Sequence, residues 1–95
     1  MGKTKARILI VDDDKDVLQT DNIFLKQHYS EVITLENPDD IPKIIMEGKV
    51  DVVLLDMNFA PGITTGWEGI HWLKEIRKLD PEAYVLMNTA YGDIK

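Results

Sequence analysis

Short apolar runs alternate with amphipathic stretches along this chain. Apart from Arg7 and Glu31, positions 6–11, 31–35, 52–55 and 83–87 carry apolar or β-branched residues. The run at 52–55 is apolar on both faces and bounded by Asp51 and Asp56. Runs this short are typical of strands buried inside a parallel sheet. The pattern therefore predicts four strands, with the run at 52–55 in the middle of the sheet.

The first amphipathic stretch, residues 14–29, predicts a helix. Asp14 opens it, no Gly or Pro interrupts it, and Asp21 is the one polar residue on its apolar stripe. The stripe itself is formed by Val17, Leu18, Phe24, Leu25 and His28.

Two further helices follow from start and stop signals. Asn37-Pro38 is a cap-and-start signal, and Gly48 is the matching stop. Thr65 and Glu68 have capping-box spacing, so the next helix should begin near Gly66. The buried residues expected in these two helices are Ile41, Ile44 and Ile45, and then Ile70, Leu73, Ile76 and Leu79, before Asp80-Pro81 ends the second helix.

Strands that alternate with helices predict an α/β fold: a doubly wound parallel sheet with right-handed crossovers and helices on both faces. The carboxyl ends of parallel strands share one edge, which is where open α/β sheets bind ligands. That edge carries Asp12, Asp13, Asp56, Asn58 and Thr89.

Composition narrows the class of protein. The chain has 95 residues, enough for one domain, with 44% hydrophobic and 29% charged residues and a net charge of −6. An acidic chain without a basic stripe argues against direct contact with nucleic acid. Without cysteine there is no disulfide, thiol nucleophile or thiolate metal site. No apolar run is long enough to span a membrane and no signal-peptide pattern precedes the first strand, so we expect a soluble cytoplasmic protein.

The acidic edge has a specific chemistry. Carboxylates gathered at one place raise one another's pKa unless a cation joins them. An all-oxygen ligand set suits Mg²⁺. A carboxylate, a divalent cation and a hydroxyl donor are the minimum equipment for accepting a phosphoryl group on aspartate.

With these motifs the chain resembles the receiver domains of bacterial two-component response regulators. The resemblance is carried by residues 8–14 (Ile-Leu-Ile-Val-Asp-Asp-Asp), 52–58 (Val-Val-Leu-Leu-Asp-Met-Asn) and 87–93 (Met-Asn-Thr-Ala-Tyr-Gly-Asp), and by the Pro and Gly of the intervening loop. It implies a flavodoxin-like sheet of order 2-1-3-4-5.

The resemblance also implies a role for each residue at the edge. It makes Asp56 the phospho-acceptor, and Asp12 and Asp13 the acidic pair that binds Mg²⁺ together with Asp56. It makes the backbone carbonyl of Asn58 a further metal ligand and Thr89 the switch hydroxyl. A sensor histidine kinase is the implied phosphoryl donor and partner.

The resemblance also bears on the process that the protein regulates and on which elements of the family's domain lie within residues 1–95. Residues 89–94 look like those of NtrC-like, sigma-54-dependent transcription activators, which implies an output in transcription regulation. Residues 1–95 are expected to be a truncated receiver domain of strand order 2-1-3-4, without the family's fifth strand, fifth helix and phosphoryl-contacting lysine. The last strand would then lie at an unprotected edge and apolar surface of the first strand would be exposed, so we expect association, for example as a homodimer.

Two other function classes fit parts of the pattern. One is a receiver-like interaction module that is never phosphorylated. The other is a haloacid-dehalogenase-like phosphatase, which also places an Asp after an apolar strand and binds Mg²⁺. That family uses Asp-x-Asp, however, and here the second position is Asn58. We therefore expect a phospho-acceptor that at most takes phosphate from small donors and loses it again, and not an enzyme with turnover.

Overall fold

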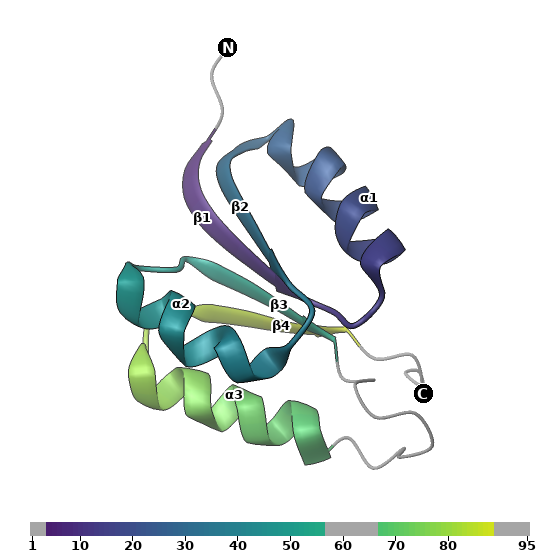
Figure 1. Cartoon of the computed structure of the whole chain (residues 1–95). Helices are drawn as coiled ribbons and strands as arrows, with labels where there is room; N and C mark the ends of the chain where they lie inside the picture. Colours follow the sequence, from purple (N-terminus) through teal and green to yellow (C-terminus); the bar gives the residue numbers. More distant parts are fainter. Residues whose placement is uncertain (1–3, 57–66, 89–95) are drawn as a thin grey trace, which may run out of the picture.

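The computed structural model describes residues 4–56 and 67–88. Strands and helices alternate along this part of the chain, as the sequence pattern predicts (Figure 1). The elements are β1 (Thr4–Val11), α1 (Lys15–Lys26), β2 (Tyr29–Leu35), the 3₁₀ turn η1 (Pro38–Asp40), α2 (Ile41–Glu47), β3 (Val52–Asp56), α3 (Trp67–Leu79) and β4 (Tyr84–Asn88).

The strands form one parallel sheet of order β2-β1-β3-β4. This confirms the predicted fold class and the predicted order. Because all neighbours are parallel, the carboxyl ends of the strands lie along one edge of the sheet. No helix in the described part of the chain is long and apolar enough to cross a membrane.

Helices cover both faces of the sheet, α1 on one and α2 with α3 on the other (Figure 1). Side chains of β1 and β3 alternate between the two faces because strand residues have a period of two. The larger core, on the α2 and α3 side, contains Leu9, Val11, Ile41, Ile45, Val50, Val53, Leu55, Trp72, Ile76 and Ala83. The smaller core, under α1, contains Ile8, Ile10 and Leu18.

The apolar stripe of α1 is narrower than predicted. Leu18 is buried and Leu25 is half-buried, but Val17 is 37% and Phe24 59% exposed. The prediction that Val17 and Phe24 pack inward was wrong. Positions 18, 21 and 25 follow one another at helical spacing and face the sheet, so residues a third of a turn away are left outside.

The apolar stripe of α3 also differs in part. Ile76 is fully buried, but Trp72 lies in the core and Leu79, expected there, is 39% exposed. Leu79 is the last residue of α3 and therefore lies beyond the packed part of the helix. The predicted packing of Ile70 falls on a side chain outside those described.

Two helix starts follow the predicted capping chemistry, whereas Thr65 of the predicted capping box at the third start lies outside the described residues. Asp14 caps α1, since its Oδ1 accepts hydrogen bonds from the backbone N–H of Asp16 (2.9 Å) and of Val17 (3.3 Å). Asn37 caps η1 in the same way, accepting from the Asp39 N–H at 2.9 Å. These hydrogen bonds satisfy helix donors that have no partner within the helix.

Asp51 fixes the opposite edge of the sheet. Its Oδ2 accepts a hydrogen bond from the Arg7 N–H at 2.8 Å, and its own N–H donates to the Arg7 carbonyl at 2.9 Å. The Asp51 carbonyl in turn accepts from the Tyr84 N–H at 3.0 Å. One residue therefore joins β1, β3 and β4, and so helps to set their register.

Apolar exposure falls on β4 and not on β1. Tyr84 is 62% and Leu86 44% exposed, whereas Ile8 and Ile10 of β1 are 3% and 2% exposed. The expectation of exposed apolar surface on the first strand was wrong, because α1 together with the flanking strands covers β1. In the described part of the chain β4 is the outermost strand on its side of the sheet.

Candidate functional site at the carboxyl edge of the sheet

The strand register brings the predicted acidic residues to neighbouring positions. Val11 of β1 pairs with Leu55 of β3, so Asp12, the next residue, lies beside Asp56, the last residue of β3. Asp56 is in turn paired with Asn88 at the end of β4. Adjacent strands lie about 4.8 Å apart. The prediction that these strand ends form one edge is confirmed for the backbone of Asp12, Asp56 and Asn88.

Asp12 is buried, with 6% of its surface exposed. Its backbone N–H donates to the Leu35 carbonyl at 3.0 Å, which continues the β1–β2 ladder by one residue. Its Oδ1 accepts from the Asp14 N–H at 2.9 Å. Among the side chains that the structure describes, which exclude those of Asp56, residues 67–70 and residues 87–88, no other polar or charged one is buried. A carboxylate is costly to bury unless hydrogen bonds or a cation compensate it, and the Asp14 N–H supplies one such hydrogen bond.

Asp13 and the residues that follow it form an exposed acidic surface. Asp13, Asp14, Lys15 and Asp16 line a shallow depression beside the sheet edge. Asp14 is engaged as the helix cap, and Asp16 lies in the first turn of α1, where a negative charge stabilises the helix dipole. Asp13 is therefore the carboxylate of this group with no structural role in the helix.

Asp21 of α1 is a further acidic residue related to this edge. It is half-buried on the side of α1 that faces the sheet. Burial, and then the negative charge of Asp12, raise the pKa of the Asp21 carboxyl above its ordinary value. Sequence analysis found Asp21 only as an interruption of an apolar stripe. The available signal was its place between Leu18 and Leu25, which directs it toward the sheet.

Several predicted ligands lie outside what the structure describes. Asn58 and Thr89 are outside the described residues, and the side chain of Asp56 is not described. Among the side chains that are described, no three carboxylate or imidazole groups are close enough to hold a metal ion together. The donor set available at the edge consists of oxygen atoms, which is the chemistry that Mg²⁺ prefers.

A parallel α/β sheet with a buried aspartate and a second aspartate at adjoining strand ends is an arrangement that suits phosphoryl transfer to aspartate. Residues 8–95 match the response regulator receiver domain family. The chain belongs to this family, the receiver domains of two-component response regulators, which act in phosphorylation-based signalling. Receiver domains are phospho-acceptors, and they interact with histidine kinases or phosphotransfer proteins. This assignment replaces the phosphatase alternative.

Relatives of known name agree with the assignment. The chain is 29% identical over 94 residues to the transcriptional regulatory protein GlrR of Escherichia coli, covering 99% of this chain and 20% of that protein. It is 32% identical over 89 residues to sporulation initiation phosphotransferase F of Bacillus subtilis, covering 93% of this chain and 67% of that protein. The chain thus spans about a fifth of the length of GlrR.

Solved structures of receiver domains share the fold. The response regulator TrrA of Thermotoga maritima, solved in complex with Mg²⁺ and BeF, superposes with a TM-score of 0.70 at 34% identity. That comparison covers 92% of this chain and 71% of TrrA. A receiver domain from Clostridium thermocellum gives a TM-score of 0.75 at 32% identity, covering 93% and 68% of the two chains.

Proposed function

We propose that Asp56 accepts a phosphoryl group from a sensor histidine kinase. The observation that carries this proposal is the register of β1 and β3, which sets Asp56 beside the buried Asp12 at the carboxyl edge. In the reaction, a carboxylate oxygen of Asp56 forms a bond to phosphorus as the bond between phosphorus and the kinase's histidine nitrogen breaks. The histidine nitrogen keeps that electron pair and takes up a proton, and Asp56 becomes an acyl phosphate.

A divalent cation, Mg²⁺, belongs to this proposal. Asp12, Asp13 and Asp56 would hold it, with the backbone carbonyl of Asn58. When bound, the cation neutralises charge that develops on the phosphoryl oxygens. The fit rests on the oxygen-only donor set and on Asp12, whose carboxylate is held in place by the Asp14 N–H at 2.9 Å.

Thr89 is proposed as the switch hydroxyl. Asn88, one residue before it, is paired with Asp56. Thr89 follows Asn88 directly in the sequence, so we propose that its hydroxyl donates to an oxygen of the phosphoryl group. Its donation would couple phosphorylation to the segment that follows β4.

The larger context is also part of the proposal. We infer that residues 1–95 correspond to the first four strands of a receiver domain, acting in the cytoplasm and controlling transcription in the manner of NtrC-like regulators. The support is the similarity to GlrR, of which the matched segment is about a fifth. In such a two-component system, the output and the cognate kinase are provided outside residues 1–95.

Phosphorylation by a small donor tests the acceptor directly. The chain is incubated with Mg²⁺ and acetyl phosphate, and covalent phosphate is measured by intact mass and by its release with hydroxylamine. We expect one phosphate per chain, lost in Asp56→Asn and retained in Asp16→Asn, which removes an exposed carboxylate of α1. Phosphate on Asp56→Asn would contradict the acceptor assignment.

Beryllofluoride binding distinguishes the remaining alternative. A receiver-like module that is never phosphorylated would show neither the covalent label nor saturable Mg²⁺-dependent beryllofluoride binding. We expect binding in the parent chain and its loss in Asp13→Asn, with unchanged far-UV circular dichroism. Equal Mg²⁺ affinity in Asp13→Asn would show that Asp13 is not a ligand.

A further inference from the structure

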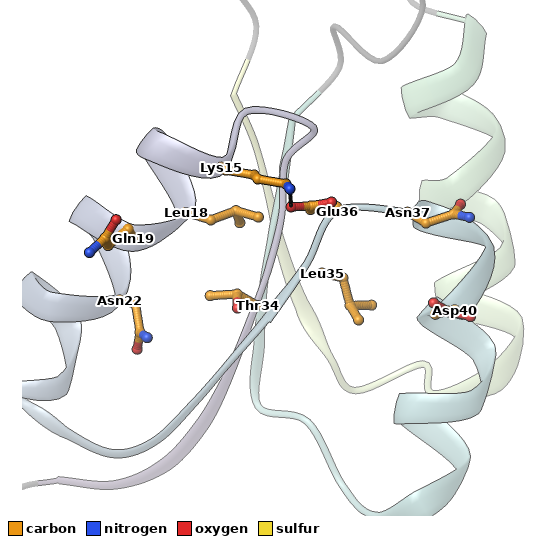
Figure 2. Close-up of a pocket in the computed structure, with 9 residues that line it drawn as sticks. All are labelled: Lys15, Leu18, Gln19, Asn22, Thr34, Leu35, Glu36, Asn37 and Asp40. Carbon is orange, nitrogen blue, oxygen red and sulfur yellow. Dashed lines mark ion pairs between the residues drawn. The ribbon is translucent and has the colours of Figure 1, made fainter.

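A polar groove lies on the other side of α1 from the exposed apolar residues of that helix. It runs between α1, the end of β2 and the start of η1, and its volume is about 610 Å³ (Figure 2). The residues that line it are Lys15, Leu18, Gln19, Asn22, Thr34, Leu35, Glu36, Asn37 and Asp40. The groove takes no part in the proposed phosphoryl chemistry, because none of the residues proposed for Mg²⁺ or phosphate lines it.

The groove follows the free edge of β2. β2 pairs with β1 and is the outermost strand on its side of the sheet. The Leu35 carbonyl accepts from the Asp12 N–H at 3.0 Å, so the backbone groups of Leu35 point toward β1. Backbone groups of successive strand residues point to opposite sides. The N–H and C=O of Thr34 therefore point away from β1, where another extended chain can bind them.

The wall formed by α1 supplies a second set of polar groups. The Oδ1 atom of Asn22 is buried and has no hydrogen-bond partner among the described residues. A buried acceptor without a partner is unfavourable, so the Asn22 carboxamide gains a hydrogen bond if it turns into the groove toward a peptide N–H. Gln19 also lines this wall, and Figure 2 shows both carboxamides on α1 with Thr34 on the strand. Neutral carboxamides complement the N–H and C=O groups of a peptide.

The mouth of the groove carries net negative charge. Glu36 lies 3.8 Å from Lys15 in an exposed ion pair, which neutralises one acidic group. Asp40 precedes α2, but its side chain makes no capping hydrogen bond. Two carboxylates and one ammonium group leave an excess of one negative charge. A lysine or arginine side chain of a ligand complements it.

We propose that this groove binds a short extended peptide of a partner protein that carries a lysine or arginine. The peptide adds a strand beside Thr34, its backbone completes the hydrogen bonding of Asn22, and its basic side chain pairs with Asp40. Recognition of this kind takes affinity from main-chain hydrogen bonds and specificity from side-chain contacts. Of β2, only Thr34 and Leu35 line the groove, so the peptide site is confined to the carboxyl end of the strand.

Titration with a defined peptide tests the proposal. The probe is acetyl-Val-Thr-Lys-Thr-Val-amide, added to the ¹⁵N-labelled chain up to about 10 mM, a range that detects binding near −4 kcal/mol. We expect saturable shifts of the Thr34 backbone amide and of the Asn22 side-chain amide. No saturable shift, or shifts centred on β4, would overturn the proposal.

Matched ligands and variants separate edge binding from charge attraction. A peptide with alternate amides N-methylated, and one with glutamate replacing lysine, should bind at least about fivefold more weakly. Asn22→Leu should weaken binding about tenfold and Asp40→Asn about threefold, whereas Asp39→Asn, outside the groove, should leave it unchanged. Should Asn22→Leu lose its native circular dichroism, Asp40→Asn and the N-methylated peptide decide the outcome. Equal affinity for the N-methylated and unmodified peptides would refute the added strand.

Discussion

Replacing Asp21 should stabilise the fold. Asp21 lies between Leu18 and Leu25 on the side of α1 that faces the sheet and is half-buried there. A leucine at this position would be about half-buried, worth about 1 kcal/mol of the 1.5–3 kcal/mol for full burial. Leucine also has a higher helix propensity than aspartate, by about 0.4 kcal/mol. Asp21→Leu should therefore raise the free energy of unfolding by about 1.5 kcal/mol, or Tm by about 6–12 °C.

The pH dependence of this effect tests its cause. Burial and the charge of Asp12 raise the pKa of Asp21 above its ordinary value, so the folded chain binds this proton more tightly than the unfolded chain does. The stabilisation from the protonated form is complete below the unfolded pKa and is lost as the pH rises through the folded pKa. Asp21→Asn removes the charge without adding apolar surface. Its free energy of unfolding should exceed that of the parent chain near pH 7, and the difference should disappear at low pH. Urea unfolding of both chains at several pH values measures this. A stability difference that does not vary with pH would refute a charge penalty at Asp21.

Three further substitutions test separate parts of the fold. Asp14→Ala removes the cap of α1 and should cost about 1 kcal/mol of unfolding free energy in urea, whereas Asp13→Ala, at an exposed position without a capping role, should cost little. Asp51→Ala leaves the Arg7 N–H without its acceptor and should cost about 1–3 kcal/mol in the same assay. Leu86→Lys places a charge on β4 and should shift the chain toward monomer in light scattering across a concentration series, and an unchanged distribution would show that β4 does not mediate association.

The topology could be predicted from the sequence because each element has a strong local signal. Residues 52–55 are apolar on both faces, which predicts a strand inside a sheet; Val53 and Leu55 are fully buried, and Val52 and Leu54, on the α1 side, are half-buried. Asp14 and Asn37 are capping residues whose hydrogen bonds depend on nearby backbone alone. These features are local, so they require no knowledge of the distant chain.

The solvent exposure of individual apolar side chains could not be predicted in the same way, because it depends on how each helix is rotated against the sheet. Phe24 satisfies the helical period as well as Leu25 does, yet it is 59% exposed and Leu25 is half-buried. Tyr84 and Leu86 belong to an apolar strand, but α1 covers the half of the sheet formed by β1 and β2. Tertiary packing decides which apolar residues are buried, and the hydrophobic period of a single segment gives no information about that packing.

For the candidate site, too, the sequence could predict some features and not others. Asp12 and Asp56 could be assigned to one edge because parallel strands share their direction, and the register confirms it. The effect of Asp12 on the pKa of Asp21 could not be predicted from the sequence, because it depends on how close α1 lies to the end of β1. Asp12 is buried and Asp21 is half-buried, so both depart from the rule that buried side chains are apolar. Departures from local consistency are expected at functional sites, where charge is retained despite its cost to stability. Both departures lie within electrostatic reach of each other beside the strand end that carries Asp56. An apolar side chain at position 21 would stabilise the fold, whereas at position 12 the carboxylate is the group that the proposed cation site requires.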